Sequence, residues 1–338
     1  MAGAPKVAIL GAGSVGCFIG GAWLAAGVPV TFIGRPRLSK DTDEHGLTLS
    51  DYSGWQLHLG PGEIDFRCGP EGLEDAEIIV LTVKSGDTQR AADDIAMQGS
   101  AGATVISFQN GVSNVEILEQ NLCGRFEVVR GMVPYNVAYL GEGQFHKGVA
   151  GDLYVERHDR MRALADAIGG GPAALKLSDD MMGLAWGKLL INLNNAVNAL
   201  SGKTLQDELR SRDYRRVFAA SIREGLSLLR RAGIDPATVG PISPHVLPRL
   251  IDSPDWVFNN IFLKRWKIDS RARSSMADDL AAGRKTEVDY LNGELVRLAE
   301  RLQRSAPVNR AIVELVHKAE AGAKPLAPAE LRRAVLGG

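Results

Sequence analysis

Residues 6–16 read KVAILGAGSVG, and this stretch decides the fold. The first five residues form a short apolar run typical of a buried strand, and a helical pattern follows to about residue 26. Between them, Gly11 permits a tight turn, Gly13 lets the backbone approach a pyrophosphate, and Gly16 allows the helix to pack closely on the strand. The pyrophosphate would lie at the helix N-terminus. Strand before and helix after favour a dinucleotide-binding loop over an ordinary glycine-rich turn. The predicted cofactor contacts in this loop are Gly11, Ala12, Gly13, Ser14, Val15 and Gly16.

The end of the next predicted strand, residues 30–33, indicates which dinucleotide binds. Sites that prefer NAD usually place Asp or Glu there to hold the ribose hydroxyls, whereas this chain reads FIGRPR over residues 32–37. The guanidinium of Arg35 can grip phosphate oxygens through two parallel hydrogen bonds, and an acidic residue would repel them. Arg35 therefore predicts the 2′-phosphate of NADP. The alternative is a surface arginine in a loop.

Further apolar runs predict a mostly parallel sheet with helices on both faces. The runs at 76–83 and 104–108 each end in polar residues, with Lys84 after the first and Asn110 after the second. In open α/β sheets the ligand lies beyond the carboxyl ends of the strands, so both side chains are expected near the reactive end of the cofactor. For Asn110 the alternative is an ordinary Asn-Gly turn. The remaining predicted elements are a hairpin at 45–49 and 55–59, strands at 127–133, 144–146, 153–155 and 174–177, the second and third of these antiparallel, and a helix at 157–168.

From residue 179 the pattern becomes helical, and residues 186–200, WGKLLINLNNAVNAL, predict one buried helix. At about 100° per residue, Lys188, Asn192 and Asn195 lie on one line of an otherwise apolar surface. A buried lysine is costly unless it is paired, and burial disfavours its charged form. Lys188 is therefore either held by a partner or kept for proton transfer. The alternative is a snorkelling lysine beside asparagines that cap the helix.

The rest of this half also reads as helices, at 213–232, 274–282 and 286–303. Thr286 is the predicted N-cap of the last helix, with Asp289 as its capping partner, and Glu287 is expected in the first turn. Residues 235–254 are proline-rich and predict a long loop. The basic run Arg210, Arg212, Arg215 and Arg216 predicts a solvated helix face.

Length and composition set the remaining bounds. With 338 residues, 45% hydrophobic and 23% charged, the chain can bury two cores. A net charge of −1 points to neither nucleic acid nor an anionic membrane surface. Cys17, Cys68 and Cys123 are far apart and lack metal-ligand spacing, so we expect no disulfide, no metal site and a reducing compartment. No signal peptide or membrane-spanning run is evident, and we expect a cytoplasmic protein.

Taken together, these motifs resemble the ketopantoate reductase (2-dehydropantoate 2-reductase) family over nearly the whole chain. Each motif alone is weak, but their order and spacing are specific. They are GAGSVG from residue 11, GRPR from 34, VK from 83, QNG from 109, WGKLLIN from 186, SSM from 274 and TEVDYLNG from 286.

The resemblance implies an α/β fold, with an N-terminal Rossmann domain (1–178) whose sheet is doubly wound and mostly parallel, and an all-helical substrate-binding domain (179–338). It also implies NADPH-dependent reduction of ketopantoate to pantoate, a step towards coenzyme A. A small 2-keto acid is the implied partner, and a homodimer is possible for this class. Carried over by position, Lys188 is the implied general acid, Lys84 and Asn110 lie at the nicotinamide end, and Asn192, Ser275 and Glu287 contact the substrate. We further expect Glu287 to be catalytic and to lie on the cofactor side, and Asn195 and Asn110 to contact the substrate.

Elementary chemistry agrees with Lys188 as the acid. Hydride delivered to a ketone carbon leaves an alkoxide, and a positioned proton donor is worth about 10² to 10⁴-fold in rate. One departure bears on the substrate: the family has a further asparagine where this chain has Ala196, and Asn195 is the residue expected to replace it. The alternatives are an NADP-dependent reductase of another small 2-keto acid and a non-catalytic NADP-binding sensor. A sensor would need neither Lys188 nor Glu287.

Overall fold

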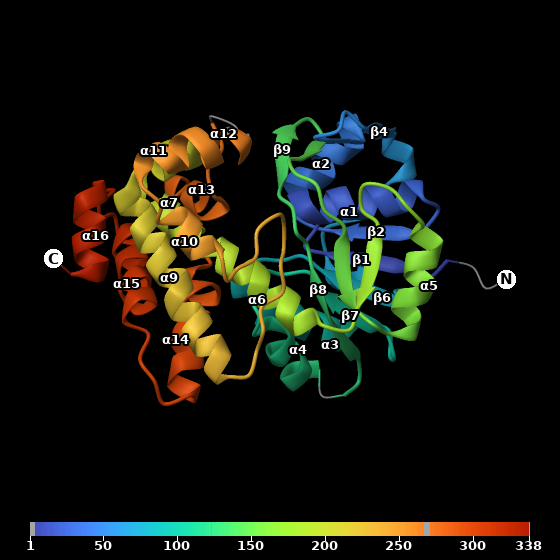
Figure 1. The fold of residues 1–338 in the computed structure, drawn as a ribbon. Helices are drawn as coiled ribbons and strands as arrows, with labels where there is room; N and C mark the ends of the chain where they lie inside the picture. The colour runs from blue at the N-terminus through green and yellow to red at the C-terminus, as the bar shows by residue number, and fades with distance from the viewer. Residues whose placement is uncertain (1–3, 123, 267–270, 338) are drawn as a thin grey trace. The chain divides into compact units, whose positions relative to one another are not determined.

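In the computed structural model, the strand predicted at the start of the chain is β1 (Val7–Leu10), and it lies inside an eight-stranded sheet (Figure 1). The strand order is β12-β11-β8-β7-β6-β1-β2-β5, and every pairing is parallel except that of β11 with β8. This is the expected doubly wound sheet. The other strands are β2 (Val30–Ile33), β5 (Asp65–Arg67), β6 (Ile78–Leu81), β7 (Thr104–Ser107), β8 (Glu127–Met132), β11 (Leu153–Glu156) and β12 (Leu175–Ser178).

The structure describes residues 4–122, 124–266 and 271–337. By its internal contacts the chain divides into two units, Met1–Met181 and Met182–Gly338. The helices of the first unit are α1 (Ser14–Ala25), α2 (Pro36–His45), α3 (Thr88–Gln98), α4 (Asn114–Leu122) and α5 (Asp159–Ile168), together with the short turns η1 (Pro61–Glu63), η2 (Pro70–Leu73) and η3 (Ser85–Asp87).

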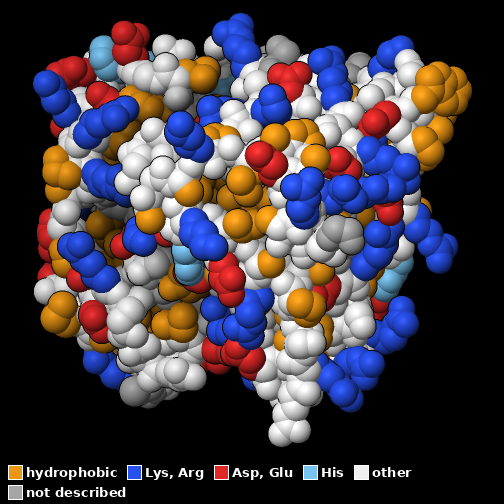
Figure 2. Space-filling view, turned by 90° about the vertical axis from the view of Figure 1, so that its left-hand side faces the viewer, with side chains coloured by type: hydrophobic (Ala, Val, Ile, Leu, Met, Phe, Trp, Pro, Cys, Tyr) orange, Lys and Arg blue, Asp and Glu red, His pale blue; other side chains and the backbone are white. Residues whose placement is uncertain are grey.

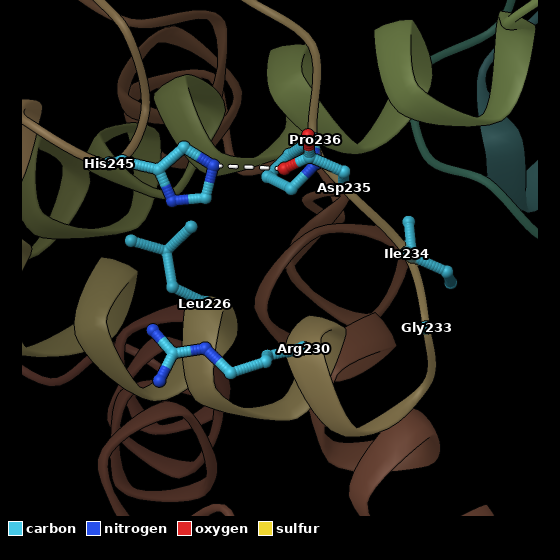
Figure 3. A pocket seen from close by; sticks show the side chains of 7 residues that line it. All are labelled: Leu226, Arg230, Gly233, Ile234, Asp235, Pro236 and His245. Atoms are coloured by element: carbon cyan, nitrogen blue, oxygen red, sulfur yellow. Dashed lines mark hydrogen bonds and ion pairs between the residues drawn. The ribbon is translucent and has the colours of Figure 1, made fainter.

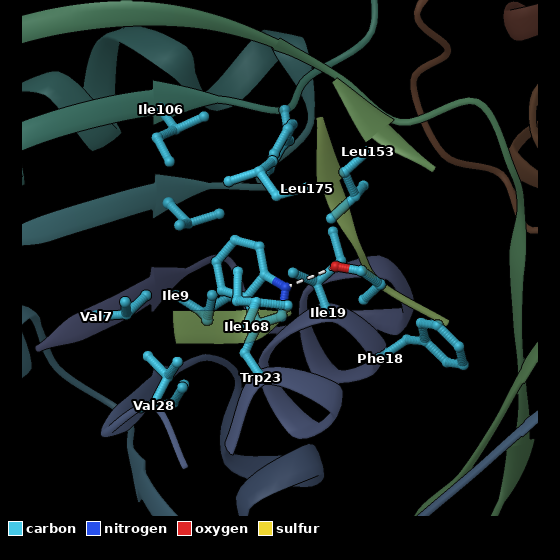
Figure 4. Close-up of a cluster of buried hydrophobic side chains, with 14 of the residues drawn as sticks. Val7, Ile9, Phe18, Ile19, Trp23, Val28, Ile106, Leu153, Ile168 and Leu175 are labelled. Atoms are coloured by element: carbon cyan, nitrogen blue, oxygen red, sulfur yellow. Dashed lines mark hydrogen bonds between the residues drawn. The ribbon is translucent and has the colours of Figure 1, made fainter. Parts of the chain in front are cut away.

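The side chains of β1 enter two separate apolar cores, because successive residues of a strand point to opposite faces. Val7 and Ile9 pack in a cluster with residues of α1 and α5, among them Trp23, whose indole N–H donates to the Ala173 carbonyl at 2.8 Å (Figure 4). Ala8 and Leu10 pack in the other cluster, with side chains from α3 and α4. Burial on both faces explains why the strand is apolar at every position.

A second, four-stranded sheet carries the predicted hairpin, which is confirmed. The antiparallel pair is β3 (Leu47–Asp51) and β4 (Gln56–Leu59). It is extended by β10 (Gln144–Lys147) and β9 (Val137–Gly141), in the order β4-β3-β10-β9. The sequence patterns had indicated neither β9 nor β5. Both alternate partly buried with exposed residues, so they lack the apolar runs that marked the central strands.

Every regular element described in the second unit is helical, as expected. Its first helix, α6 (Met181–Asn192), begins at the boundary residue. The others are α7 (Asn194–Ser201), α8 (Leu205–Arg210), α9 (Arg212–Arg231), α10 (Leu247–Ile251), α11 (Asp255–Val257), the π-helix η4 (Phe258–Phe262), α12 (Leu263–Trp266), α13 (Ser275–Ala281), the 3-10 turn η5 (Val288–Tyr290), α14 (Asn292–Arg301), α15 (Pro307–Glu320) and α16 (Pro328–Leu336).

The single helix predicted over residues 186–200 is in fact two helices, α6 and α7, which meet at Leu193. Leu193 keeps helical backbone angles (φ −58°, ψ −24°), and its amide still donates to the Leu189 carbonyl at 3.0 Å. The interruption is therefore local. It falls among Asn192, Asn194 and Asn195, and asparagine favours helix ends over helix interiors.

The helix predicted from Thr286 begins later, at Asn292, and the 3-10 turn η5 precedes it. Thr286 does not cap this helix, because its amide and its hydroxyl both donate to the Glu320 carboxylate of α15 at 2.8 Å. Its expected capping partner Asp289 instead pairs with His317 at 3.1 Å. Glu287 therefore lies just before a 3-10 turn and outside any α-helix.

Two expectations for α9 and the segment after it are wrong. Residues 235–254 are not all loop, since α10 forms within them. Arg215 does not lie on a solvated face, because its side chain is fully buried. Its guanidinium donates to the carbonyls of Ile251 and Ser253 at 2.5 and 2.8 Å, pairs with Asp255, and lies 4.2 Å from the Phe258 ring centroid. These partners replace the hydration that the guanidinium loses on burial, so Arg215 lies in the core despite its charge.

The cysteines and the surface add little to the chemistry. Cys17 is buried, which raises the pKa of its thiol, and Cys68 is exposed; both are free, and Cys123 lies outside the described residues. Over the ranges that the structure covers, no cluster of His, Cys, Asp and Glu could hold a metal ion. No helix there is long and apolar enough to cross a bilayer. On the face drawn in Figure 2, basic and acidic side chains are interspersed.

Candidate functional site

The glycine-rich loop after β1 has the contacts that its sequence predicts. Gly11 has a φ of +95°, and a Cβ there would lie 2.6 Å from the backbone nitrogen of Val83. A Cβ on Gly16 would lie 2.6 Å from Thr82 Oγ1, so only glycine lets α1 pack this closely on the sheet. At Gly13 the nearest atom would be 3.8 Å away. The backbone at Gly13 is therefore open to an incoming group.

The backbone amides of this loop divide into two sets. Those of Gly11 and Ala12 donate to the Ile33 carbonyl at 2.9 and 2.8 Å, that of Gly13 donates to the Gly11 carbonyl at 2.6 Å, and together they fix the turn. Gly13 is the N-cap of α1 and offers no side chain to cap it. The first amides of a helix have no partner within the helix, and their dipoles favour an anion. The amides of Ser14, Val15 and Gly16 hold these first positions of α1.

Arg35 lies beside the same loop. It follows β2 directly as the N-cap of α2, and its side chain is exposed. A Cβ on the preceding Gly34 would lie 2.9 Å from the Ala12 carbonyl oxygen, so the backbone before Arg35 packs against the glycine-rich loop. Arg37, two residues on, stacks over the Tyr139 ring at 5.5 Å. Arg35 is therefore the arginine of this pair that is placed next to the loop.

Lys84 and Asn110 follow β6 and β7 at the carboxyl edge of the sheet, where the glycine-rich loop follows β1. Lys84 is exposed and Asn110 is partly buried. The Asn110 carbonyl accepts hydrogen bonds from the Ser85 hydroxyl at 2.9 Å and from the Asn114 side-chain amide at 2.6 Å. These bonds join the loops that carry Lys84 and Asn110. The sequence assigned no role to Ser85 or Asn114, because a single buried polar residue leaves no periodic signal.

In the second unit, Lys188 and Glu287 form the charged centre of the candidate site. Lys188 lies on α6 and is partly buried, and Glu287 is partly buried before η5. Burial lowers the pKa of Lys188 to about 8, while the negative charge of Glu287 acts in the opposite direction. The ammonium form still predominates at pH 7, and its pKa is close enough to neutrality for proton transfer.

A backbone contact fixes α6 next to this lysine. The Ala237 amide donates to the Gly183 carbonyl at 2.8 Å, and a Cβ on Gly187 would lie 2.0 Å from the Ala237 carbonyl oxygen. No residue with a side chain fits at Gly187 without moving the backbone. The loop after α9 therefore rests directly on the turn of α6 that carries Lys188.

The predicted substrate residues of this unit have different exposures. Asn192 and Asn195 are partly buried, and Ser275 is exposed at the first position of α13. The structure brings two of them together through Ser274, whose hydroxyl lies 3.1 Å from the Asn195 carbonyl and accepts from the Ala277 amide to cap α13. Ala196, the residue beside Asn195, is fully buried.

Two surface pockets can be set aside. One, in the second unit, has Arg230 and the ion pair of His245 with Asp235 (3.0 Å) in its wall (Figure 3). The other, in the first unit, is lined by Asp51 and Lys147 among others. Neither includes a predicted site residue.

A dinucleotide loop at the carboxyl edge of a doubly wound sheet, followed by a helical unit with a partly buried lysine and a glutamate, defines a dinucleotide-binding oxidoreductase. The chain belongs to the ketopantoate reductase family. The profile described as "Ketopantoate reductase PanE/ApbA" matches residues 7–160, and that of its C-terminal part matches residues 180–320.

Individual relatives agree with this assignment. A 2-dehydropantoate 2-reductase of Archaeoglobus fulgidus is 28% identical, over 94% of this chain and 98% of its own. The crystal structure of a PanE/ApbA family ketopantoate reductase from Ralstonia eutropha JMP134 superposes with a TM-score of 0.79 at 29% identity, covering 94% of this chain and 98% of that one. D-mandelate dehydrogenase, solved with NADH and anilino(oxo)acetate, shares the fold at 20% identity, with a TM-score of 0.75 and coverage of 94% and 98%.

Proposed function

We propose that this protein reduces ketopantoate to pantoate with NADPH, on the route to pantothenate and coenzyme A. In this proposal residues 1–178 bind NADP and residues 179–338 bind the substrate. The observation that carries it is Lys188, a partly buried lysine on the helix of the WGKLLIN motif. Burial lowers the pKa of its ammonium group, and the negative charge of Glu287 offsets part of this decrease. The family and the named reductases that resemble this chain support the choice of substrate.

The residues of the first unit fit a bound dinucleotide. The open backbone at Gly13 and the first amides of α1 would hold the pyrophosphate, and Arg35 the 2′-phosphate. Lys84 and Asn110 would lie at the nicotinamide end. When bound, the reduced nicotinamide supplies the hydride.

The residues of the second unit would handle the substrate oxygen atoms. Lys188 donates a proton to the oxygen that becomes an alkoxide, and its charge offsets the developing negative charge. Glu287 holds the lysine or accepts a hydrogen bond from the terminal hydroxyl of the substrate. Asn192, Asn195 and Ser275 are the proposed ligands of the remaining polar atoms.

One observation favours a second candidate, an NADP-dependent reductase of a different small 2-keto acid. Ala196 is fully buried and offers no amide, at the position where the resemblance leads us to expect an asparagine. The acid Lys188 would be the same in both reactions, and the difference would lie in how the far end of the substrate is bound.

Oxidation of NADPH, followed by its absorbance against a panel of 2-keto acids, separates these functions. We expect ketopantoate to have the highest kcat/KM. A higher value for another acid would support the second candidate. If no acid in the panel oxidised NADPH while the dinucleotide still bound, the proposal would give way to a non-catalytic NADP-binding protein.

Arg35→Ala should raise the KM for NADPH by about tenfold or more and leave the KM for NADH nearly unchanged, because only NADPH loses a charge-assisted pair. The measurement is steady-state kinetics with each cofactor. Lys40→Ala is the matched control, since it removes an exposed cation from the same helix, α2. Equal effects of Arg35→Ala on both cofactors would remove the basis for NADP.

A further inference from the structure

Glu208 on α8 is a carboxyl group placed entirely inside the second unit. Its Oε2 atom accepts hydrogen bonds from the side-chain amides of Asn194 and Asn198 on α7, at 3.0 and 3.4 Å. A buried carboxylate without a cation beside it is costly, and amide donors compensate for only part of the lost hydration. Burial therefore favours the neutral, protonated form of Glu208 over the carboxylate.

Two neighbouring oxygen atoms indicate which protonation state the structure favours. Among the residues that the structure describes, Glu208 Oε1 and Asn194 Oδ1 are both buried and have no hydrogen-bond partner. Both are acceptors if Glu208 is ionised. A proton on Oε1 makes it a donor, and a carboxylic acid and a primary amide can exchange two hydrogen bonds. Because Asn194 already donates to Oε2, donation from Oε1 to Asn194 Oδ1 would complete this pair.

Within the described part of the chain, the elements packed against α8 bring the following charged groups near Glu208. The helices α7, α9 and α12 pack against α8. From α9, Arg215 acts to lower the pKa of Glu208 and Tyr214 lies close enough to interact; Lys264 and Arg265 of α12 are exposed. Burial outweighs Arg215 and the two amide bonds and raises the pKa of Glu208 to about 8. This direction agrees with the unpaired acceptors.

The same network reaches the candidate site. Asn198 is fully buried, and its amide nitrogen also donates to the Lys203 carbonyl at 3.1 Å. With the nitrogen held on that side, Asn198 Oδ1 accepts from the backbone amide of Ser274 at 2.9 Å. Ser274 contacts the Asn195 carbonyl and caps α13, whose first residue is Ser275. The orientation of one buried amide thus sets the position of Ser274.

We propose that Glu208 is a positioning residue held as a neutral acid, paired with Asn194, and that through Asn198 and Ser274 it places Asn195 and Ser275 for the substrate. The first part of this proposal, that Glu208 is protonated, does not depend on which reaction the protein catalyses. The second part, that Glu208 positions Asn195 and Ser275 for the substrate, rests on the proposed function. The two parts therefore have separate tests.

The first test compares Glu208→Gln with wild type by urea unfolding between pH 5 and 9. Glutamine offers the same donor and acceptor to Asn194 but does not titrate. In wild type, the pKa is raised in the folded state, so the folded state keeps a proton that the unfolded state loses above its ordinary pKa. Wild-type stability relative to the Gln variant should fall as pH rises, by up to about tenfold in the folding equilibrium per pH unit, and level off above pH 8.

Asp207→Asn, which changes an exposed carboxyl on the same helix, is the control for this comparison. A stability difference between Glu208→Gln and wild type that is the same at every pH would overturn the neutral acid. Infrared spectra give a second readout, since the C=O band of a protonated carboxyl should be present in wild type at pH 7 and missing from the Gln variant.

The second test is a kinetic split at pH 7. Glu208→Ala should raise the KM for the 2-keto acid by about tenfold or more, because it leaves buried amide donors without an acceptor. Its kcat and its KM for NADPH should stay within about threefold of wild type. Glu208→Gln should restore the substrate KM. A Gln variant as impaired as the Ala variant would overturn the positioning role, and so would a loss of kcat with unchanged KM. If the Ala variant does not fold, the Gln variant still tests the role, because the proposal requires the Gln variant to have the wild-type KM.

Discussion

Lys188→Ala is expected to lower kcat by at least about 10²-fold while NADPH binding stays near normal. In the proposed reaction the lysine acts on the oxygen that becomes negative during hydride transfer, so its contribution belongs to the transition state. NADPH affinity, measured by fluorescence titration, should change little, because the residues proposed to hold the pyrophosphate and the 2′-phosphate belong to the other unit. Lys285→Ala removes an exposed lysine near Glu287 and is the matched control.

The pH dependence gives the same prediction a second test. A general acid must be protonated, and the pKa of Lys188 is lowered to about 8. Wild-type kcat/KM should therefore be level below this pH and fall about tenfold per unit above it. The residual activity of Lys188→Ala should lack this decline. A folded variant with full activity would return Lys188 to a structural role.

The second large effect concerns the substrate hydroxyl. If Asn192, Asn195 and Glu287 read the terminal hydroxyl of ketopantoate, an analogue lacking only that group should be reduced with a kcat/KM lower by about 10² or more. A site built to bind a hydroxyl rejects the analogue without it, because its buried polar groups are then left unpaired. The measurement is steady-state kinetics with the two compounds.

Asn195→Ala should narrow that gap, since Asn195 is the partly buried amide next to the fully buried Ala196. Asn260→Ala, which removes an exposed asparagine of the same unit, should leave it unchanged. Similar rates on both compounds in the wild-type enzyme would show that the hydroxyl is not read. The assignment would then pass to a broader 2-keto acid reductase that uses the same lysine.

The sequence predicted the parts of the fold that repeat a simple physical pattern. The central strands are apolar at every position because both faces are covered. Gly11 and Gly16 are required because a Cβ at either position would lie only 2.6 Å from a neighbouring atom. The second unit was predicted as helical because its apolar residues repeat with the period of a helix. The weaker strands β5 and β9 lack such patterns and were missed.

The errors come from residues whose partners lie far away in the sequence. Arg215 looked solvent-exposed because its charge is visible in the sequence and the carbonyls of Ile251 and Ser253 are not. Thr286 looked like a helix cap because Glu320 is 34 residues away. Glu208 was not noticed at all, since nothing in LQDELR distinguishes the buried carboxyl from its exposed neighbour Asp207. Tertiary hydrogen bonds, which leave no local pattern, decide all three.

The contact between Gly187 and Ala237 has a consequence for how this enzyme can diversify. It is made by main-chain atoms on both sides, an amide bonded to the Gly183 carbonyl and a carbonyl oxygen against a glycine. Because the side chain of Ala237 takes no part in these contacts, other residues at this position could make the same main-chain contacts with α6. Sequence changes can therefore accumulate in this loop over many generations while Lys188, one residue beyond Gly187, keeps its place on α6.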